Sequence, residues 1–152
     1  MFIYEENPIW DLNKERIIGP ERESFCIEDV EVNAELPYEW WRLEDDTTHE
    51  ILGYGWITVN EKVNEAEISL CIAQEHRGER IGEQILNNLE QQIIVNNLPR
   101  NIIANIYGSN TYASRVIQLL QNQGYNSTLP IETTRVLVSN GCDVTFVKEL
   151  NL

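Results

Sequence analysis

The clearest hydrophobic pattern in the chain spans residues 64–98. Over residues 64–73, apolar side chains alternate with polar or small ones, which predicts a strand with one apolar face. Apolar residues then recur every three or four positions and predict an amphipathic helix from about Glu79 to Asn97, with Pro99 as the stop signal. The apolar positions are Ile68, Leu70 and Ile72 in the strand, and Ile81, Ile85, Leu86, Leu89, Ile93 and Ile94 in the helix.

Two strand-like runs precede this unit, at residues 38–44 and 50–59. Short polar segments connect these runs to each other and to the strand at 64–73, so the three strands are expected to form an antiparallel meander. Gly53 and Gly55 lie inside the second run and indicate a bulge or close packing against a neighbouring element.

Beyond the long helix, the apolar run at residues 101–107 predicts a strand. Because a helix connects it to the strand at 64–73, the two strands are expected to be parallel. A second helix is predicted to begin with Ser109 or Asn110 as its N-cap and to end at Gly124.

The two ends of the chain have weaker patterns. Residues 133–138 and 144–148 are strand-like, and Asn140-Gly141 between them predicts a tight hairpin. Residues 1–37 show no clean period, so we expect a short strand or loop followed by one or two short helices or irregular segments.

Composition narrows the class of protein. The 152 residues suffice for one domain with a proper core, and the net charge is −14. Fifteen acidic residues lie in the first 50 positions against four basic ones, which disfavours nucleic acid and favours a cationic partner or simply solubility. Three widely spaced cysteines predict no disulfide framework and no metal site. With no signal peptide and no membrane-spanning run, a cytoplasmic location is expected.

The loop between the strand at 64–73 and its helix carries two glycines and two arginines, Gly78, Gly82, Arg77 and Arg80. Free backbone N–H groups and the helix dipole at a helix N-terminus favour an anion such as phosphate. Glycine permits a close approach of ligand to backbone. The alternative is an ordinary helix start with two solvated arginines.

The segment EISLCIAQEHRGERIG resembles the cofactor-binding segment of the GNAT N-acetyltransferase superfamily, whose signature is Gln/Arg-x-x-Gly-x-Gly/Ala after a strand. Arg77 and Gly82 match the outer positions of this signature, and Arg80 stands where the family has its middle glycine. The resemblance extends more weakly over about residues 51–150. Further landmarks are the run ILGYGWI, the pattern Asn110-x-x-Ala113 and the closing Gln123-Gly124-Tyr125.

This resemblance implies a single α/β domain over residues 1–152 with a mixed, mostly antiparallel sheet of about six or seven strands. Helices would cover both faces, and the parallel strand pair would splay apart to admit acetyl-CoA as co-substrate. Residues 1–37 would be the variable acceptor side, residues 38–107 the strands and the cofactor helix, and residues 108–152 the second helix and the closing hairpin. The implied cofactor-binding residues are Leu70, Ile72, Arg77, Gly78, Glu79, Arg80, Ile81, Gly82 and Asn110.

Acetyl transfer to an amine requires removal of an amine proton, which a nearby carboxylate can accept. Glu67 is the candidate base, where some histone-type members carry their catalytic glutamate; Glu65, on the same face of the strand, is the alternative. A surface pair between Glu67 and Arg42 is the competing structural explanation. A backbone N–H near Ile72 would polarise the thioester carbonyl.

Cysteine and tyrosine are the other residue types that could take part in catalysis. Cys71 has no paired histidine in the sequence pattern and is expected to be a buried apolar cysteine. The family's general-acid tyrosine has no counterpart, because counting from either landmark reaches Ile117 or Leu120. Tyr107, Tyr112 or water remain as proton donors.

The adjacent residues Trp40 and Trp41 must point to opposite faces of their strand, so one fills the core and the other is exposed or lines a pocket. The outer tryptophan either covers an apolar edge or forms an aromatic wall for a cationic acceptor, with Tyr38 and Glu44 as companions.

The sequence is therefore compatible with three functions. The first is an acetyl-CoA-dependent N-acyltransferase acting on a primary amine of a small molecule or protein. The second is a CoA-binding or protein-interaction module without catalysis. The third is an α/β domain that docks a basic partner on its acidic face. Either a monomer or a homodimer is compatible with the open sheet edges.

Overall fold

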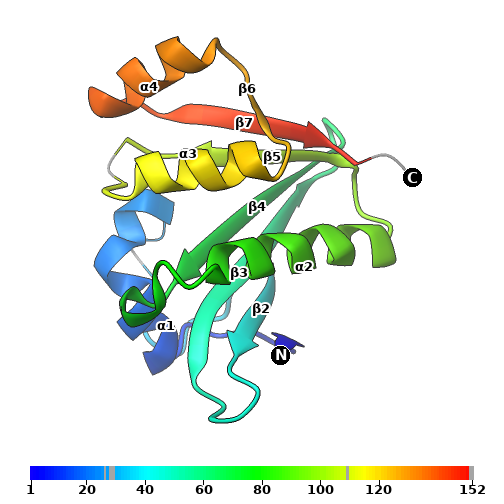
Figure 1. Cartoon of the computed structure of the whole chain (residues 1–152). Coiled ribbons are helices and arrows are strands. Elements are labelled where there is room, and N and C mark those ends of the chain that lie inside the picture. The colour runs from blue at the N-terminus through cyan, green and yellow to red at the C-terminus, as the bar shows by residue number, and fades with distance from the viewer. Residues whose placement is uncertain (26, 28–29, 109, 151–152) are drawn as a thin grey trace.

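The computed structural model contains a mixed, seven-stranded sheet with helices on both faces (Figure 1), and it describes residues 1–25, 27, 30–108 and 110–150. The strands are β1 (Phe2–Tyr4), β2 (Glu39–Glu44), β3 (Ile51–Asn60), β4 (Glu65–Ile72), β5 (Asn101–Ile106), β6 (Asn126–Ser127) and β7 (Val144–Glu149). The helices are α1 (Leu12–Ile17), α2 (Ile81–Val95), α3 (Ala113–Asn122) and α4 (Ile131–Ser139), with 3₁₀ turns at Gly19–Phe25 and Gln74–His76. The strand order is β1-β2-β3-β4-β5-β7-β6, and only β4 and β5 are parallel neighbours. The predicted fold class is confirmed.

The predicted meander is also confirmed, because β2, β3 and β4 pair antiparallel in sequence order. The turn between β2 and β3 is closed by Asp45, whose carboxylate accepts hydrogen bonds from the backbone N–H groups of Thr47 and Thr48 at 2.9 Å each. In the β3–β4 register, Trp56 lies opposite Ser69 and Thr58 lies opposite Glu67. These four side chains therefore share one face of the sheet.

The parallel strands β4 and β5 pair over only three positions, from Glu65 opposite Asn101 to Glu67 opposite Ile103. Beyond Glu67, β4 continues to Ile72 without a pairing partner on that side, and β5 continues to Ile106 paired only with β7. The two strands consequently separate towards their C-terminal ends, which is the expected splay.

Two hydrophobic cores lie on opposite faces of the sheet. Helices α2 and α3 cover one face, where Ile85 and Leu89 of α2 pack over Gly53 and Gly55 of β3. A Cβ atom on Gly55 would come within 2.7 Å of Ile85 Cγ2, so the glycines mark the predicted close packing. The N-terminal segment covers the other face with Trp10, Ile17 and Ile18 packed against the sheet.

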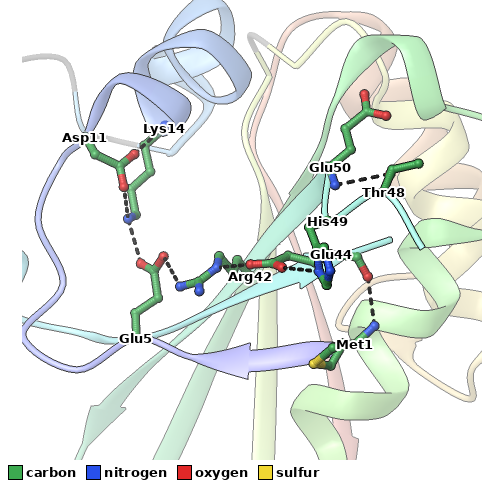
Figure 2. A network of polar contacts seen from close by, with 9 residues as sticks. All are labelled: Met1, Glu5, Asp11, Lys14, Arg42, Glu44, Thr48, His49 and Glu50. Atoms are coloured by element: carbon green, nitrogen blue, oxygen red, sulfur yellow. Dashed lines mark hydrogen bonds and ion pairs between the residues drawn. The ribbon is translucent and has the colours of Figure 1, made fainter. Parts of the chain in front are cut away.

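A nearly buried ion pair holds this N-terminal segment in place (Figure 2). Lys14 of α1 is 1% exposed, and its Nζ donates to Glu5 Oε1 at 2.6 Å. Asp11 caps α1 by accepting from the Lys14 backbone N–H at 2.9 Å. Arg42 of β2 bridges Glu5 and Glu44, so the alternative pairing of Arg42 with Glu67 is wrong.

The predicted hairpin at the C-terminal end is wrong in its first half. Residues 131–139 form helix α4 instead of a strand, although Val and Thr favour strands. Ile131, Thr134 and Val138 follow helical spacing, and packing of this face overrides the local preference. Gly141 adopts φ +79° and closes α4 in a Schellman motif, with Cys142 N–H donating to Leu137 O at 2.9 Å.

Most of the remaining local predictions are confirmed. The first 25 residues form one short strand, a short helix and a 3₁₀ segment. Gly124 follows α3 with φ +87°. The predicted side-chain cap of α3 is wrong for Asn110, because the helix begins at Ala113 with Tyr112 at its N-cap and without a side-chain cap hydrogen bond. Asn110 instead closes the turn before the helix by accepting from the Tyr112 backbone N–H at 2.8 Å. The alternative cap Ser109 lies outside the described residues. Within the described part of the chain, no helix has the length and apolar character to cross a bilayer.

Candidate active site

The loop before α2 has a backbone shaped for an anion. Gly78 has φ +90° and open space where a Cβ atom would lie, and Arg80 has φ +61°, a left-handed conformation that favours glycine. Arg80 therefore keeps the backbone conformation that a glycine would adopt there. The backbone N–H groups of residues 80–83 donate to no acceptor among the described residues, so the positive end of α2 is open to a ligand.

A groove of about 780 Å³ opens in front of this loop, between β4, α2 and α3. It is lined by every predicted cofactor residue except Glu79, which instead hydrogen-bonds His76. Arg80 and Arg115 line the groove without an ion pair in the described part of the chain. A Cβ atom on Gly82 would come within 3.1 Å of Ile72 and Leu119, so the groove wall is tight here. Free N–H donors and unpaired arginines fit a phosphate-bearing ligand.

Arg77 is engaged in contacts within the protein, unlike an arginine that is free to bind phosphate. Its guanidinium forms a two-point ion pair with Glu21, one arm being Nη1–Oε1 at 3.2 Å. It also donates to the Ile72 carbonyl oxygen, from Nε at 3.2 Å and from Nη2 at 3.0 Å. The Tyr112 ring lies against it, with Cζ 3.8 Å from the ring centroid. Arg77 thus connects the N-terminal segment, the end of β4 and the start of α3.

A second cavity of about 310 Å³ lies on the opposite face of the sheet and reaches through the splay. Glu67 lines it together with its register neighbours Thr58 and Ser69, and with Asn105 across the splay. Asn105 Nδ2 donates to Glu67 Oε2 at 3.0 Å, and Thr145 Oγ1 donates to Asn105 Oδ1 at 2.6 Å. This chain of hydrogen bonds fixes the orientation of the carboxylate.

The protonation of Glu67 is tuned by its surroundings. Burial raises the pKa of its carboxyl above the ordinary value, and the hydrogen bond from Asn105 opposes part of that shift. A carboxylate with a raised pKa is a stronger base than an exposed glutamate. Glu65, the alternative base, lies outside the lining of this cavity.

The aromatic wall of the cavity comes from a different tryptophan than the sequence suggested. Trp40 and Trp41 do lie on opposite faces, but both are buried, at 0% and 3% exposure, and neither lines the cavity. The prediction that one of them is exposed or lines a pocket is wrong because α2 and the N-terminal segment cover both faces. Trp56 lines the cavity instead, with Trp40 stacked on it at 4.3 Å between ring centroids.

The two companions proposed for this wall have different locations. Tyr38 lines the cavity. Glu44 lies at the far end of β2, bound to Arg42, so its prediction as an acceptor ligand is wrong. The alternation of residues along β3 contained a signal for Trp56, but only the pairing register aligns it with Ser69 and next to Glu67.

The groove and the cavity adjoin at the splay. They share the lining residues Phe25, Leu70, Asn110, Val116 and Leu119. The Ala73 N–H points towards β3, where it donates to Leu52 O. Backbone N–H groups alternate in direction along a strand, so those of Leu70 and Ile72 point the other way, towards the splay. A ligand in the groove can therefore reach the Glu67 cavity between two backbone donors of β4.

Comparison with known proteins agrees with this geometry. The model of the acetyltransferase (GNAT) family matches residues 7–136. The chain belongs to the GNAT acetyltransferase family. Acetyl-CoA is the co-substrate of this family.

Solved structures of GNAT proteins share the fold. A Klebsiella pneumoniae protein named as a candidate acyl-CoA N-acyltransferase has a TM-score of 0.71 at 17% identity, covering 99% of this chain and 97% of that one. A spermidine N-acetyltransferase chimera from Vibrio cholerae and hSSAT has a TM-score of 0.66 at 12% identity, covering 98% and 96%. A Sinorhizobium meliloti phosphinothricin acetyltransferase, solved with AcCoA, has a TM-score of 0.58 at 18% identity, covering 75% and 62%. No curated protein matches the chain.

Other candidate groups of this GNAT chain lie near the site. Cys71 is buried, its Sγ donates to Glu21 Oε2 at 3.4 Å, and burial raises the pKa of its thiol far above the ordinary value. It is therefore a neutral thiol and a poor nucleophile. Tyr107 lines the cavity with Glu67, whereas Tyr112 lines the groove and stacks on Arg77.

Outside these two spaces, the fold brings together Glu50, Glu75 and His76 at the surface, with ligand-type atoms within 4.8 Å of one another. His76 hydrogen-bonds Glu50 and Glu79, and these bonds raise the pKa of its imidazole. The sequence spacing gave no signal for this group.

Proposed function

We propose that this chain transfers an acetyl group from acetyl-CoA to a primary amine, with Glu67 as the base. The observation that carries the proposal is the junction of the two spaces at the splay between β4 and β5. One space has the donors and cations suited to a pyrophosphate, and the other has a half-buried carboxylate suited to an amine. A cytoplasmic setting is part of the proposal.

The chain would hold acetyl-CoA through the α2 N-terminus and the cations of the groove. The N–H groups of residues 80–83 would bind the pyrophosphate, and Arg80 and Arg115 would add formal positive charge. When bound, acetyl-CoA supplies an activated acetyl thioester. The Leu70 and Ile72 N–H groups that face the splay would donate to the thioester carbonyl as negative charge develops.

Glu67 would act on the amine. An ammonium ion has no lone pair, so it must lose one proton before its nitrogen can attack. Glu67 accepts that proton, directly or through water. The amine nitrogen attacks the carbonyl carbon, the carbon–sulfur bond breaks, and the sulfur keeps the electron pair. The sulfur takes up one proton and a second proton leaves the nitrogen. The net change converts an ammonium ion and acetyl-CoA into an N-acetyl amide, CoA thiol and one released proton.

Tyr107 is the phenol that we propose as proton donor to the departing sulfur. It follows β5 and lines the same cavity as Glu67, across the splay from it. Tyr112 would serve less well, because the Arg77 guanidinium covers its ring. Changing Tyr107 to Phe should lower kcat by about tenfold to a hundredfold, and Tyr112→Phe is its matched control.

The test of the function separates binding from chemistry. Calorimetric titration should show that acetyl-CoA binds the parent chain and the variant Glu67→Gln equally well. With a panel of primary amines, Glu67→Gln should lose about 10²–10⁴-fold in kcat. The matched control is Glu65→Gln, on the same face of β4 but outside the cavity, which should keep parental activity. Binding of acetyl-CoA without transfer to any amine would instead favour a CoA-binding module without catalysis.

A further inference from the structure

The part of the Glu67 cavity on the acceptor face is largely aromatic. Four aromatic residues line it: Phe25 of the N-terminal segment, Tyr38 just before β2, Trp56 of β3 and Tyr107 just after β5. Phe25 contacts the Trp56 ring edge-on at 5.1 Å between centroids, and Trp40 stacks behind Trp56. The wall is therefore rigid and presents apolar surface to a ligand.

Glu67 is the one charged side chain among the described residues that line this cavity. The other polar groups on the acceptor face are neutral: the side chains of Ser24, Thr58, Ser69 and Asn105 and the hydroxyls of Tyr38 and Tyr107. An ammonium next to Glu67 would have both a counter-charge and aromatic neighbours. A second ammonium deeper in the cavity would have no described carboxylate to pair with, and burying an unpaired charge is costly.

The cavity is also small. Its volume of about 310 Å³ is at the lower end of the range of about 300–1,000 Å³ found for sites of drug-sized ligands. Part of that space lies within the splay, between Ile106 and Leu70, where the acetyl group would enter under the proposed function. The room left beside Trp56 suits one compact ring or apolar chain.

We infer that the acceptor is a small monoamine with an aromatic body, whose ammonium pairs with Glu67 and whose ring packs against Trp56 and Tyr38. The inference rests on the proposed function, which supplies the reaction. It adds which class of primary amine is the acceptor. It runs against the overall charge of −14, which by itself would favour a polycation. The acidic residues are numerous, yet of the described ones only Glu67 reaches this cavity.

The experiment measures binding before turnover. The protein is saturated with CoA, which cannot donate an acetyl group, and titrated in a calorimeter with 2-phenylethylamine, n-butylamine or spermidine. We expect 2-phenylethylamine to bind with a Kd about tenfold lower than either of the others, because only it offers both a single ammonium and a ring. Glu67→Gln should weaken binding of 2-phenylethylamine and n-butylamine alike.

A variant of the wall tests the ring contact. Tyr38 is 37% exposed, so Tyr38→Leu should fold normally, whereas replacing buried Trp56 would disturb the core. Tyr38→Leu should raise the Kd of 2-phenylethylamine several-fold and leave that of n-butylamine unchanged. The control is Tyr4→Leu, an exposed tyrosine of β1 outside the cavity, which should change neither.

The outcomes distinguish this inference from the proposed function. Equal or tighter binding of spermidine overturns the inference, and its acetylation would leave the proposed function standing. Selective binding of 2-phenylethylamine without acetylation supports an aromatic monoamine as the ligand of this cavity, but overturns both the proposed acetyl transfer and the role of that amine as acceptor. If none of the amines binds at millimolar concentration, the assignment of this cavity to an amine is wrong.

Discussion

Arg77 belongs to the segment that resembles the GNAT cofactor signature, but its contacts predict that it mainly stabilises the fold. The Arg77 side chain is 12% exposed and Glu21 is 14% exposed. An exposed ion pair contributes about 0.2–1 kcal/mol. Breaking a fully buried one costs about 3–5 kcal/mol, because the remaining charge is left unpaired. With its carbonyl and ring contacts as well, Arg77→Ala should destabilise the fold by about 3 kcal/mol.

The assay is a double-mutant cycle by thermal and urea unfolding. For a chain of this size, about 3 kcal/mol corresponds to a melting temperature lowered by about 6–12 °C. Arg77→Ala and Glu21→Ala should each destabilise, and the double variant should cost less than their sum, with a coupling energy of about 2 kcal/mol. The control is Arg16→Ala, which breaks the half-exposed Arg16–Glu75 pair and should cost at most about 1 kcal/mol.

The same variants decide what Arg77 does for acetyl-CoA. Glu21→Ala should leave acetyl-CoA binding unchanged or tighter, because it releases the Arg77 charge into the groove while the fold is weakened. The reasoning would be refuted if Arg77→Ala weakened acetyl-CoA binding tenfold or more with an unchanged melting temperature. That result would make Arg77 a direct phosphate ligand, as the sequence resemblance implies.

Three further predictions follow from single residues. Arg80→Gly should stabilise the fold by about 1 kcal/mol, because φ +61° is strained for arginine, while weakening acetyl-CoA binding a few-fold at low salt; an unchanged urea midpoint would contradict it. Asn105→Ala should raise the pKa of Glu67 further, because the lost hydrogen bond favoured the charged carboxylate. The acid limb of the pH profile of kcat/KM should therefore move to higher pH, and an unmoved limb would exclude Glu67 as the base. Gly53→Ala should destabilise by about 1–3 kcal/mol, because its Cβ would lie 2.8 Å from the Cys71 carbonyl oxygen, and unchanged thermal unfolding would argue against this packing.

Several features of the fold could be predicted from the sequence because their causes are local. The alternation over residues 65–72 and the stripe of α2 set a strand, a loop and a helix within 31 residues of chain, from Glu65 to Val95. Gly124 closes α3 for a similarly local reason, since a left-handed residue is needed there. Strand parity likewise places Glu67 on the face opposite Ile68 and Leu70, which the pattern alone can predict.

Helix α4 shows where local patterns fail. Its Thr and Val residues have strand propensity, and Asn140-Gly141 suits a hairpin as well as a helix end. Contacts of Thr134 decide between them, because it is fully buried and its hydroxyl lies 2.5 Å from that of Ser127. Such contacts join segments that the sequence pattern treats as independent.

The sequence by itself indicated the family, and it predicted the loop proposed to bind the cofactor and the candidate base. Only the tertiary structure decided that Trp56 and not Trp40 or Trp41 lines the Glu67 cavity, and that Arg77 is paired with Glu21, 56 positions earlier. The physical reason is one of range. Periodicity and turn chemistry act over a few residues, whereas strand register and the pairing of buried charges are fixed by packing summed over the whole chain.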